Sequence, residues 1–359
     1  MAEGKALDYF LDLVKIAAPS MKEERVADFI IKTVNGKVDI VKKDSFGNVY
    51  VSIDGKGRPI FFIAHMDTVE PCDGAKPIVE DGYVKSDGKT ILGADDKASI
   101  GVMLALIEEL GGKEHRPIEF VFFRSEESGN LGAINFDYGL LKAKEGFCFD
   151  SSTAVGTIIT ASPYYDSFNL KVIGRTSHAS RPKEGVNALL IFSEALQKIK
   201  LGELDEETLM NIGIVESGHA RNAIPGEVIA RGEIRGFTHE RMKMHAEKLK
   251  ETIESTVSKY NARYELDIIR ENPGYKDIDK TAHELFAYVK NAILSLGLTP
   301  TIGPPWGVSD ANILNDGKGL VCINLGYGAE MTHSKEERIK VSALSQLQKL
   351  MLKLVQLKV

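Results

Sequence analysis

Four stretches of the chain consist almost entirely of apolar side chains, and this feature restricts the fold most strongly. Uniformly apolar strands are buried on both faces, which happens where helices cover a parallel or mixed sheet. Residues 98–110 are also apolar nearly all round and stop at Gly111 and Gly112, as a helix packed against a sheet would. We therefore predict an α/β fold with a mixed, mostly parallel sheet and helices on both faces. The four predicted strands are RPIFFIAH at 58–65, PIEFVFF at 117–123, GFCF at 146–149 and LVCINLG at 320–326.

The sequence changes character in the middle of the chain, which indicates a second domain. Strands of alternating polarity are mixed there with two helices, one of which carries an apolar stripe at spacings of three or four residues. Turn-rich segments bound this stretch on both sides. We predict a catalytic domain made of residues 1–163 and 275–359, with an α+β domain at residues 164–274 inserted into it.

Imidazole and carboxylate side chains lie where these predicted strands end and where the apolar helix begins. In α/β proteins ligands bind at the carboxyl edge of the sheet, so we expect these side chains to share one crevice. Nitrogen and carboxylate ligands without cysteine suit zinc, cobalt or manganese in a catalytic site. Two such ions could share a carboxylate, polarise a carbonyl and hold a water as hydroxide, which predicts hydrolysis. The residues are His65, Asp67, Asp95, Asp96, Glu126, Glu127, Asp150 and His333.

Each of these residues also has an ordinary structural interpretation. A histidine after a strand is more often packed in the core or on the surface than bound to a metal. Adjacent aspartates often cap a helix, and for Asp96 capping is at least as good an interpretation as a role in the chemistry. The two neighbouring glutamates could form a solvated loop, and Asp150 could belong to a turn. We interpret the charged residues 335–338 as solvated surface. Five histidines lack a partner motif and are assigned no function: His115, His219, His239, His245 and His283.

Eight separate motifs carry a resemblance to a known family, and they occur in that family's order. They are HMDTVEP at His65, GADDKASIGVMLALIEEL from Gly93, FFRSEESGNLGA from Phe122, FDSS at Asp150, GRTSHAS ending at Ser180, RNAIPGE from Arg221, GVSDAN ending at Asn312 and MTHSKEE from Met331. Together they resemble the co-catalytic zinc exopeptidase family that includes peptidase T, carboxypeptidase G, aminoacylase and succinyl-diaminopimelate desuccinylase. The peptidase-T-like branch is the most similar, and the resemblance covers nearly the whole chain.

The resemblance implies a centre of two divalent metal ions. His65 and Asp150 would bind one ion, Glu127 and His333 would bind the other, and Asp95 would bridge the two. Zinc is the expected metal, with cobalt or manganese as alternatives.

The resemblance also implies the residues that act beside the metals. Asp67 would orient His65, since a ligating imidazole needs a partner that fixes its tautomer. Glu126 would be the general base that takes a proton from the metal-bound water and returns it to the leaving amine. The family often has a cis peptide bond after the bridging aspartate, which here would join Asp95 to Asp96. A loop of the catalytic domain resembles the family's substrate loop at Ser309, Asp310 and Asn312.

The inserted domain, residues 164–274, would be the family's lid, which often forms a dimer interface. His178 resembles the lid histidine that donates to the tetrahedral oxyanion. Asn222 and Arg235 resemble residues that hold polar groups of the substrate, because an arginine fork matches a carboxylate. Arg235 could instead be a surface cation on an edge strand. We expect a homodimer in which His178 completes the neighbouring active site, although closure of the lid within one subunit is the alternative.

The favoured function is a di-metal hydrolase that cleaves short peptides, with tripeptidase-like aminopeptidase action. Asp150 favours this version, since aspartate there is typical of tripeptidase-like members whereas deacylases and carboxypeptidases usually carry glutamate. The alternative is an N-acyl amino acid deacylase or carboxypeptidase-like amidohydrolase with the same metal centre. A non-catalytic relative would be expected to lose a ligand or the base, and a nicotinamide oxidoreductase would need a G-x-G-x-x-G turn that is absent here.

Composition limits the partners and the compartment. The net charge of −6 gives no general attraction to nucleic acid or anionic lipid, and the longest apolar run falls short of the roughly 20 residues of a membrane span. We therefore expect neither a nucleic-acid nor a membrane partner. Residues 1–20 predict an amphipathic helix rather than a secretory signal, and a helix is also expected at 342–359. The three cysteines are widely spaced, which favours a reducing, cytoplasmic compartment.

Overall fold

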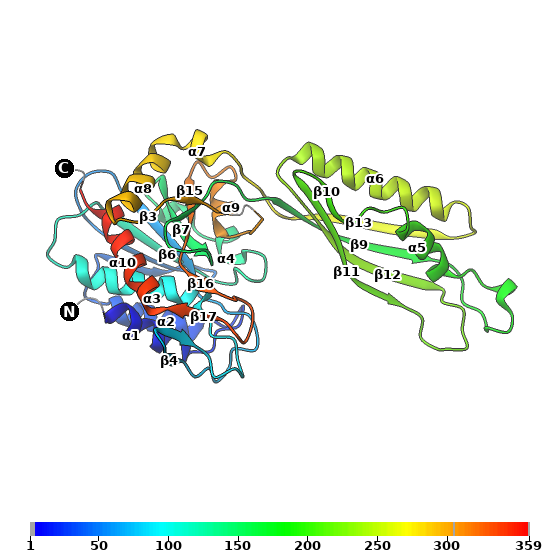
Figure 1. Ribbon diagram of the computed structural model, residues 1–359, viewed down its shortest axis with the longest axis horizontal. Coiled ribbons are helices and arrows are strands. Elements are labelled where there is room, and N and C mark those ends of the chain that lie inside the picture. The colour runs from blue at the N-terminus through cyan, green and yellow to red at the C-terminus, as the bar shows by residue number, and fades with distance from the viewer. Residues whose placement is uncertain (1–3, 304–305, 358–359) are drawn as a thin grey trace. The chain divides into compact units, whose positions relative to one another are not determined.

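The chain forms two compact units in a computed structural model that describes residues 4–303 and 306–357. One unit is made of Met1–Ala161 and Asp277–Val359, and the other of Ser162–Lys276 (Figure 1). The second unit is therefore an insertion into the sequence of the first.

The first unit is built on an eight-stranded sheet. In order across the sheet, its strands are β1 (Ile40–Lys43), β2 (Val49–Ile53), β6 (Ile118–Phe123), β3 (Ile60–His65), β7 (Glu145–Ser151), β15 (Val321–Gly326), β8 (Thr157–Ile159) and β14 (Thr301–Ile302). The four central strands β6, β3, β7 and β15 are parallel, while β1, β2 and β8 each run antiparallel to a neighbour. Every residue of β3 and β6 is buried, as their uniform apolarity predicts. The predicted mixed, mostly parallel sheet is confirmed.

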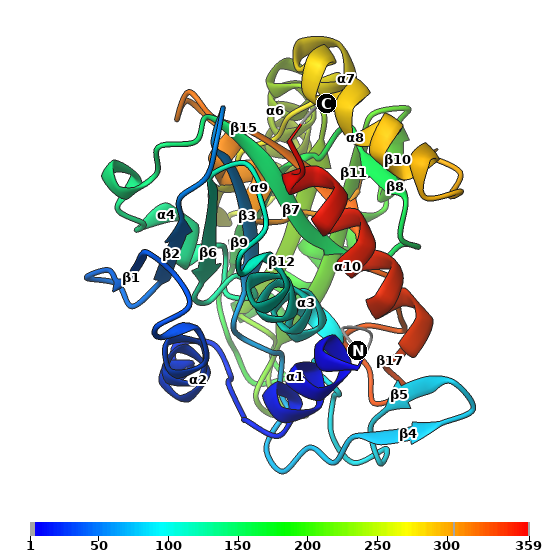
Figure 2. The ribbon, with the colours of Figure 1, turned by 90° about the vertical axis from the view of Figure 1, so that its left-hand side faces the viewer.

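Helices flank this sheet, as expected. The apolar run at 98–110 belongs to α3 (Ala94–Leu110), which is buried along most of its length and packs against β3 and β7. The helices predicted at the two ends of the chain are α1 (Lys5–Val14) and α10 (Val341–Val355), and both pack against α3 (Figure 2). Residues 1–3 and 358–359 of those two predictions lie outside the described residues. The remaining helical segments are α2 (Glu24–Val34), α4 (Leu131–Ile134), the 3-10 turn η1 (Tyr138–Leu140), α7 (Ile278–Thr281), α8 (His283–Ser295) and α9 (Asp310–Asn315).

A small antiparallel sheet completes the first unit. Its strands, in order, are β16 (Ala329–Glu330), β17 (Arg338–Lys340), β5 (Tyr83–Lys85) and β4 (Ile78–Glu80). β16 and β17 pair with each other, so the residues between them form the loop of a hairpin. This loop contains His333.

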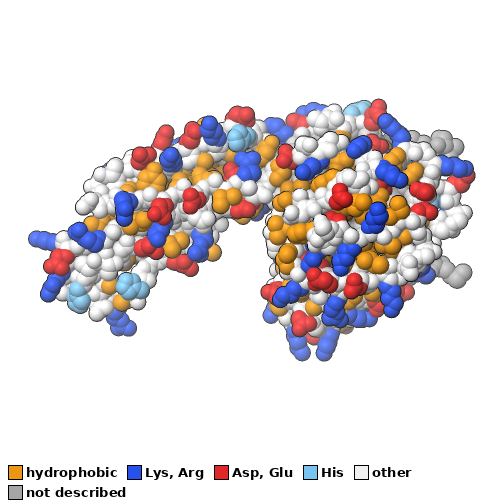
Figure 3. All heavy atoms as spheres, turned by 180° about the vertical axis from the view of Figure 1, so that it is seen from behind, with side chains coloured by type: hydrophobic (Ala, Val, Ile, Leu, Met, Phe, Trp, Pro, Cys, Tyr) orange, Lys and Arg blue, Asp and Glu red, His pale blue; other side chains and the backbone are white. Residues whose placement is uncertain are grey.

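The second unit is an antiparallel sheet with helices on one face. In order, the strands are β10 (Gly202–Asp205), β11 (Thr208–Ser217), β12 (Glu227–Gly236), β9 (Tyr164–Ile173) and β13 (Arg263–Asn272). Alternate residues of β9, namely Phe168, Leu170 and Val172, are buried in a core shared with α5 (Ala188–Leu196) and α6 (His239–Val257). A 3-10 turn, η2 (Pro182–Glu184), precedes α5. On the face seen in Figure 3, hydrophobic and charged side chains are interspersed over both units.

Among the described residues, no helix has both the length and the hydropathy that crossing a membrane would require.

Candidate metal centre

The central parallel strands deliver three of the predicted residues to one edge of the sheet. β3 ends at His65, β6 ends three residues before Glu126, and β7 contains Asp150 near its end. Because β6, β3 and β7 are parallel neighbours, these segments emerge side by side. Asp95 joins them from the first turn of α3, and His333 from the loop of the β16–β17 hairpin.

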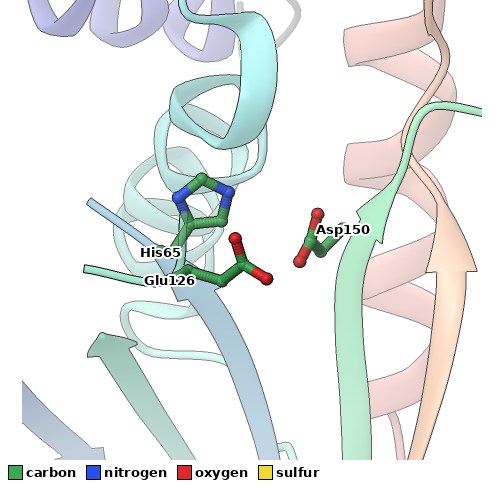
Figure 4. A group of neighbouring side chains, drawn as sticks. All are labelled: His65, Glu126 and Asp150. Carbon is green, nitrogen blue, oxygen red and sulfur yellow. The ribbon is translucent and has the colours of Figure 1, made fainter. Parts of the chain in front are cut away.

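His65, Glu126 and Asp150 form one group of side chains. Each offers a nitrogen or oxygen atom that lies within 4.8 Å of those of the other two. The carboxylates of Glu126 and Asp150 point toward each other, with the imidazole of His65 beside Glu126 (Figure 4). A cation between these atoms could be held by three different segments of the sheet edge.

Asp95 lies between two imidazoles. Its Oδ1 is 3.3 Å from His65 Nε2, and its Oδ2 is 3.4 Å from His333 Nε2. His333 Nε2 is also 2.8 Å from Glu127 Oε1, and His65, Asp95 and Glu127 form the second group that could hold a metal ion. The two oxygens of the Asp95 carboxylate thus face two different imidazoles, which is the arrangement expected of a bridging ligand.

Asp67 contacts His65 and the backbone of both neighbouring glutamates. This fully buried carboxylate lies 3.2 Å from His65 Nδ1, so it can fix the tautomer that leaves Nε2 directed at Asp95. It also accepts hydrogen bonds from the backbone N–H groups of Glu126 at 3.0 Å and Glu127 at 3.2 Å, and from the Ser20 hydroxyl at 2.7 Å. One side chain therefore sets the positions of three neighbouring segments.

The electrostatics of the cluster fit a divalent cation. Burial raises the pKa of both Glu126 and Asp150, since their negative charges are crowded away from water. Hydrogen bonds to Asp95 and Glu127 raise the pKa of His333 to about 10. Asp150 Oδ2 is buried without a hydrogen-bond partner among the described residues. Carboxylates in excess of imidazoles, with one oxygen left unpaired, form a donor set of the kind that zinc-like ions take.

The interpretation of residues 335–338 as solvated surface is wrong for Glu337. Lys335, Glu336 and Arg338 are exposed as expected, whereas Glu337 is completely buried. Its carboxylate accepts hydrogen bonds from the backbone N–H of Gly93 at 2.6 Å and of Asp95 at 3.1 Å. Glu337 therefore fixes the turn that carries Asp95, and its position inside the MTHSKEE motif is the sequence signal that could have identified it.

The neighbouring Asp96 is buried at the kink near the start of α3. Its Oδ2 lies 3.4 Å from the backbone nitrogen of His65, and its backbone is not helical, with φ −112° and ψ 23°. The peptide bond between Asp95 and Asp96 is cis, as the resemblance implies.

The side chains of Ser309 and Asn312 cap the N-terminus of α9. Ser309 is the N-cap residue, and its side chain and that of Asn312 form a reciprocal capping box with each other's backbone N–H groups. Both are buried. Their predicted contact with substrate stays a prediction, while the structure shows that they fix the start of the helix at Asp310.

The remaining predicted residues belong to the second unit. His178 and Asn222 are exposed, and their segments lie side by side, since the backbone N–H of Ala179 donates to Asn222 O at 2.9 Å. Arg235 stacks on the Tyr165 ring, with 4.8 Å between its guanidinium carbon and the ring centroid, and its Nε donates to Glu233 at 3.2 Å.

The alternative interpretation of Arg235 as a cation on an edge strand is wrong. β12, which carries it, pairs with β11 on one side and β9 on the other. The guanidinium therefore projects from the interior of the sheet.

Comparisons with protein families match both units. Residues 161–265 match the model of a peptidase dimerisation domain, and residues 48–160 match that of peptidase family M28. The chain is 35% identical to the uncharacterized protein YqjE of Bacillus subtilis, over 95% of each chain.

Two solved structures are similar over nearly their whole length. The aminopeptidase PepT of Bacillus cereus is 33% identical with a TM-score of 0.90, over 98% of both chains. A tripeptidase of Staphylococcus aureus is also 33% identical, with a TM-score of 0.92 over 99% of this chain and 98% of that one.

Proposed function

Because the chain belongs to the peptidase-T-like family of M20 metallopeptidases, we propose that it is an aminopeptidase that acts on short peptides, with free tripeptides as its preferred substrates. Membership makes it a metal-dependent exopeptidase, a hydrolase of peptide bonds. The preference for tripeptides is the finer step, and it is supported by the similar tripeptidase and by the aspartate at position 150.

The position of Asp95 between two imidazoles is the observation that carries the proposal. In this assignment His65 and Asp150 would hold one divalent ion, Glu127 and His333 would hold the other, and Asp95 would be shared between them. Zinc suits the nitrogen and oxygen ligands best, with cobalt and manganese as alternatives. When bound, the two ions polarise the scissile carbonyl and make a water acidic enough to lose its proton near neutral pH.

The chain's own residues then move the proton and place the substrate. Glu126 has its carboxylate beside the ligand atoms of His65 and Asp150, so it can accept the proton of the attacking water and return it to the leaving amine. Asp67 keeps His65 in the ligating tautomer. In the lid, His178 donates to the oxyanion, and Asn222 and Arg235 hold polar groups of the peptide. Ser309 and Asn312 shape the substrate loop through the cap of α9.

The same assignment makes the second unit a lid and dimerisation domain. Support comes from the matched dimerisation model and from the part of β11 that extends beyond its pairing with β10. β11 pairs with β12 over most of its length but with β10 only near Thr208, so its far half is an open edge in the described part of the chain. Ile214 and Val215 on that half are each 47% exposed. A homodimer through this unit would cover them.

The proposal includes a cytoplasmic location, supported by three buried cysteines that are free thiols.

One assay tests this function. The metal-loaded protein is offered free tripeptides, free dipeptides and N-acyl amino acids side by side, and bound metal is measured on the same sample. We expect tripeptides to be cleaved fastest, with release of the N-terminal residue and about two metal ions per chain. Preference for N-acylated substrates would assign the protein to the deacylases or carboxypeptidase-like amidohydrolases instead.

A further inference from the structure

Asn130 links the carboxylate of Glu126 to that of Asp310. Its Nδ2 lies 3.0 Å from Glu126 Oε1 and 3.0 Å from Asp310 Oδ1. Asn130 is 1% exposed and Asp310 2% exposed, so the contact between these two side chains is shielded from water. Neither Asn130 nor this link was identified from the sequence.

The identity of the bridging atom follows from its neighbours. An ionised carboxylate, the form in which Glu126 acts as a base, only accepts hydrogen bonds, so the amide atom between the two carboxylates is assigned as the NH₂ group and not the oxygen. The NH₂ group has two protons, one for each carboxylate. Asn130 therefore donates to both partners at the same time.

The backbone fixes Asn130 in place. It adopts φ 57° and ψ 31°, in the left-handed region, where asparagine is among the few residues other than glycine that are tolerated. Its backbone N–H donates to Glu126 O at 2.8 Å, which closes the turn between the two residues. The amide is thus attached to the same turn whose carboxylate it contacts.

The helix α9 fixes the position of Asp310. This aspartate is the first residue of α9 and lies inside the capping box that Ser309 and Asn312 form. α9 in turn packs against β15 and against β3 and β7, the two strands that carry His65 and Asp150. The cap, Asp310 and Asn130 therefore form a continuous support that ends at one oxygen of Glu126.

We propose that Asn130 is a positioning residue for the general base, which it holds by Oε1 so that Oε2 is presented to the attacking water. This inference rests on the proposed function, in which Glu126 is the base. Without the amide the carboxylate could rotate about its last side-chain bond, and proton transfer depends on hydrogen-bond geometry. The support also gives Asp310, Ser309 and Asn312 a role that needs no contact with substrate.

Two substitutions of Asn130 test the proposal. Asn130→Gly removes the amide and keeps the positive φ without strain, and Asn130→Asp keeps the shape but replaces the donor with a third carboxylate. We expect kcat to fall about 10- to 100-fold in the glycine variant and further in the aspartate variant, with KM within about threefold and bound metal unchanged. Asn135→Gly and Asn135→Asp are the matched controls. Asn135 is exposed, lies at the end of the same short helix, and donates to Leu131 O.

A double-mutant cycle separates positioning from general structural support. If Asn130 acts through Glu126, adding Asn130→Gly to Glu126→Gln should cause no further loss of kcat. Losses that multiply, a loss of bound metal, or an unchanged kcat in both Asn130 variants would each overturn the proposal. The wild type and Glu126→Gln alone are measured in the same series. A wild type that cleaves no peptide, or a Glu126→Gln variant with full turnover, would contradict the proposed function itself, which is a different outcome.

Discussion

The carboxylate of Glu337 accepts a hydrogen bond from the backbone N–H of Asp95 at 3.1 Å, and a second from that of Gly93. Asp95 is the residue whose two oxygens face His65 and His333. Glu337 thus holds Asp95 through its backbone N–H, and among the described residues it makes no hydrogen bond to either imidazole. This arrangement explains why a fully buried glutamate is found in a segment that is otherwise exposed.

The first prediction concerns this contact. Glu337→Gln should weaken metal binding about 10- to 100-fold, because the amide NH₂ cannot accept a backbone hydrogen bond and Asp95 would be held less firmly. The measurement is a titration of the metal-free protein with zinc, followed by its dissociation constants. Glu336→Gln, which changes an exposed neighbour, is the control and should match the wild type. Unchanged zinc affinity in Glu337→Gln, with only a lower melting temperature, would reduce Glu337 to a stabilising residue.

The second prediction distinguishes the base from the ligands. Glu126→Gln should retain both metal ions and lose at least about 100-fold in kcat, because the amide keeps the shape of the side chain but cannot accept the proton. Asp95→Asn should instead lose metal. Metal analysis and kinetics on the same preparations check this. If Glu126→Gln releases metal while Glu127→Gln keeps it, the roles of the two glutamates are exchanged.

The third prediction concerns Arg235. Arg235→Ala should raise KM for peptides with a free C-terminal carboxylate by about 10-fold or more, because a bidentate charge-assisted pair is lost, and should leave amidated peptides little changed. Arg231→Ala is the control, since this exposed arginine lies on the same strand and contacts Glu216. An equal rise in KM for both classes of peptide would remove Arg235 from carboxylate binding.

The parts of the molecule that the sequence predicts are those that depend on local pattern. A nearly uniform apolar composition identifies β3 and β6 because burial on both faces leaves few polar positions in a strand. His65 could be identified because it directly ends such a strand. The helix α3 is predicted in the same way, because its own residues are apolar nearly all round.

The parts that were missed depend on partners far away in the chain. Glu337 is charged and lies among charged residues, so polarity alone does not distinguish it from its exposed neighbours; its burial is decided by the N–H groups of Gly93 and Asp95. The sequence of the strand that carries Arg235 is compatible with an edge position. Its interior position follows from pairing with β11 and β9, which the sequence of a single strand does not encode. The role of Asn130 depends on its contact with Asp310, which lies 180 residues away in the chain.

The fourth prediction asks whether His178 acts on the active site of its own subunit or of a partner. His178 lies on an exposed loop of the second unit, where its Nδ1 is 2.7 Å from the Ser180 hydroxyl. His178→Ala and Glu126→Ala should each be inactive alone. His219→Ala, which changes another exposed histidine of the same unit, should keep full activity.

Co-expression of the two inactive variants separates the two possibilities. If His178 acts across the interface, a mixed dimer has one site in which Glu126 and the borrowed histidine are both intact. With random mixing, half of the dimers are mixed and half of their sites are complete, so activity per chain should return to about a quarter of the wild type. If His178 acts within its own chain, every site lacks one of the two groups, and the mixture should stay as inactive as either variant. We expect the recovery, because the unit that carries His178 also matches a dimerisation domain and leaves part of β11 open for a second copy.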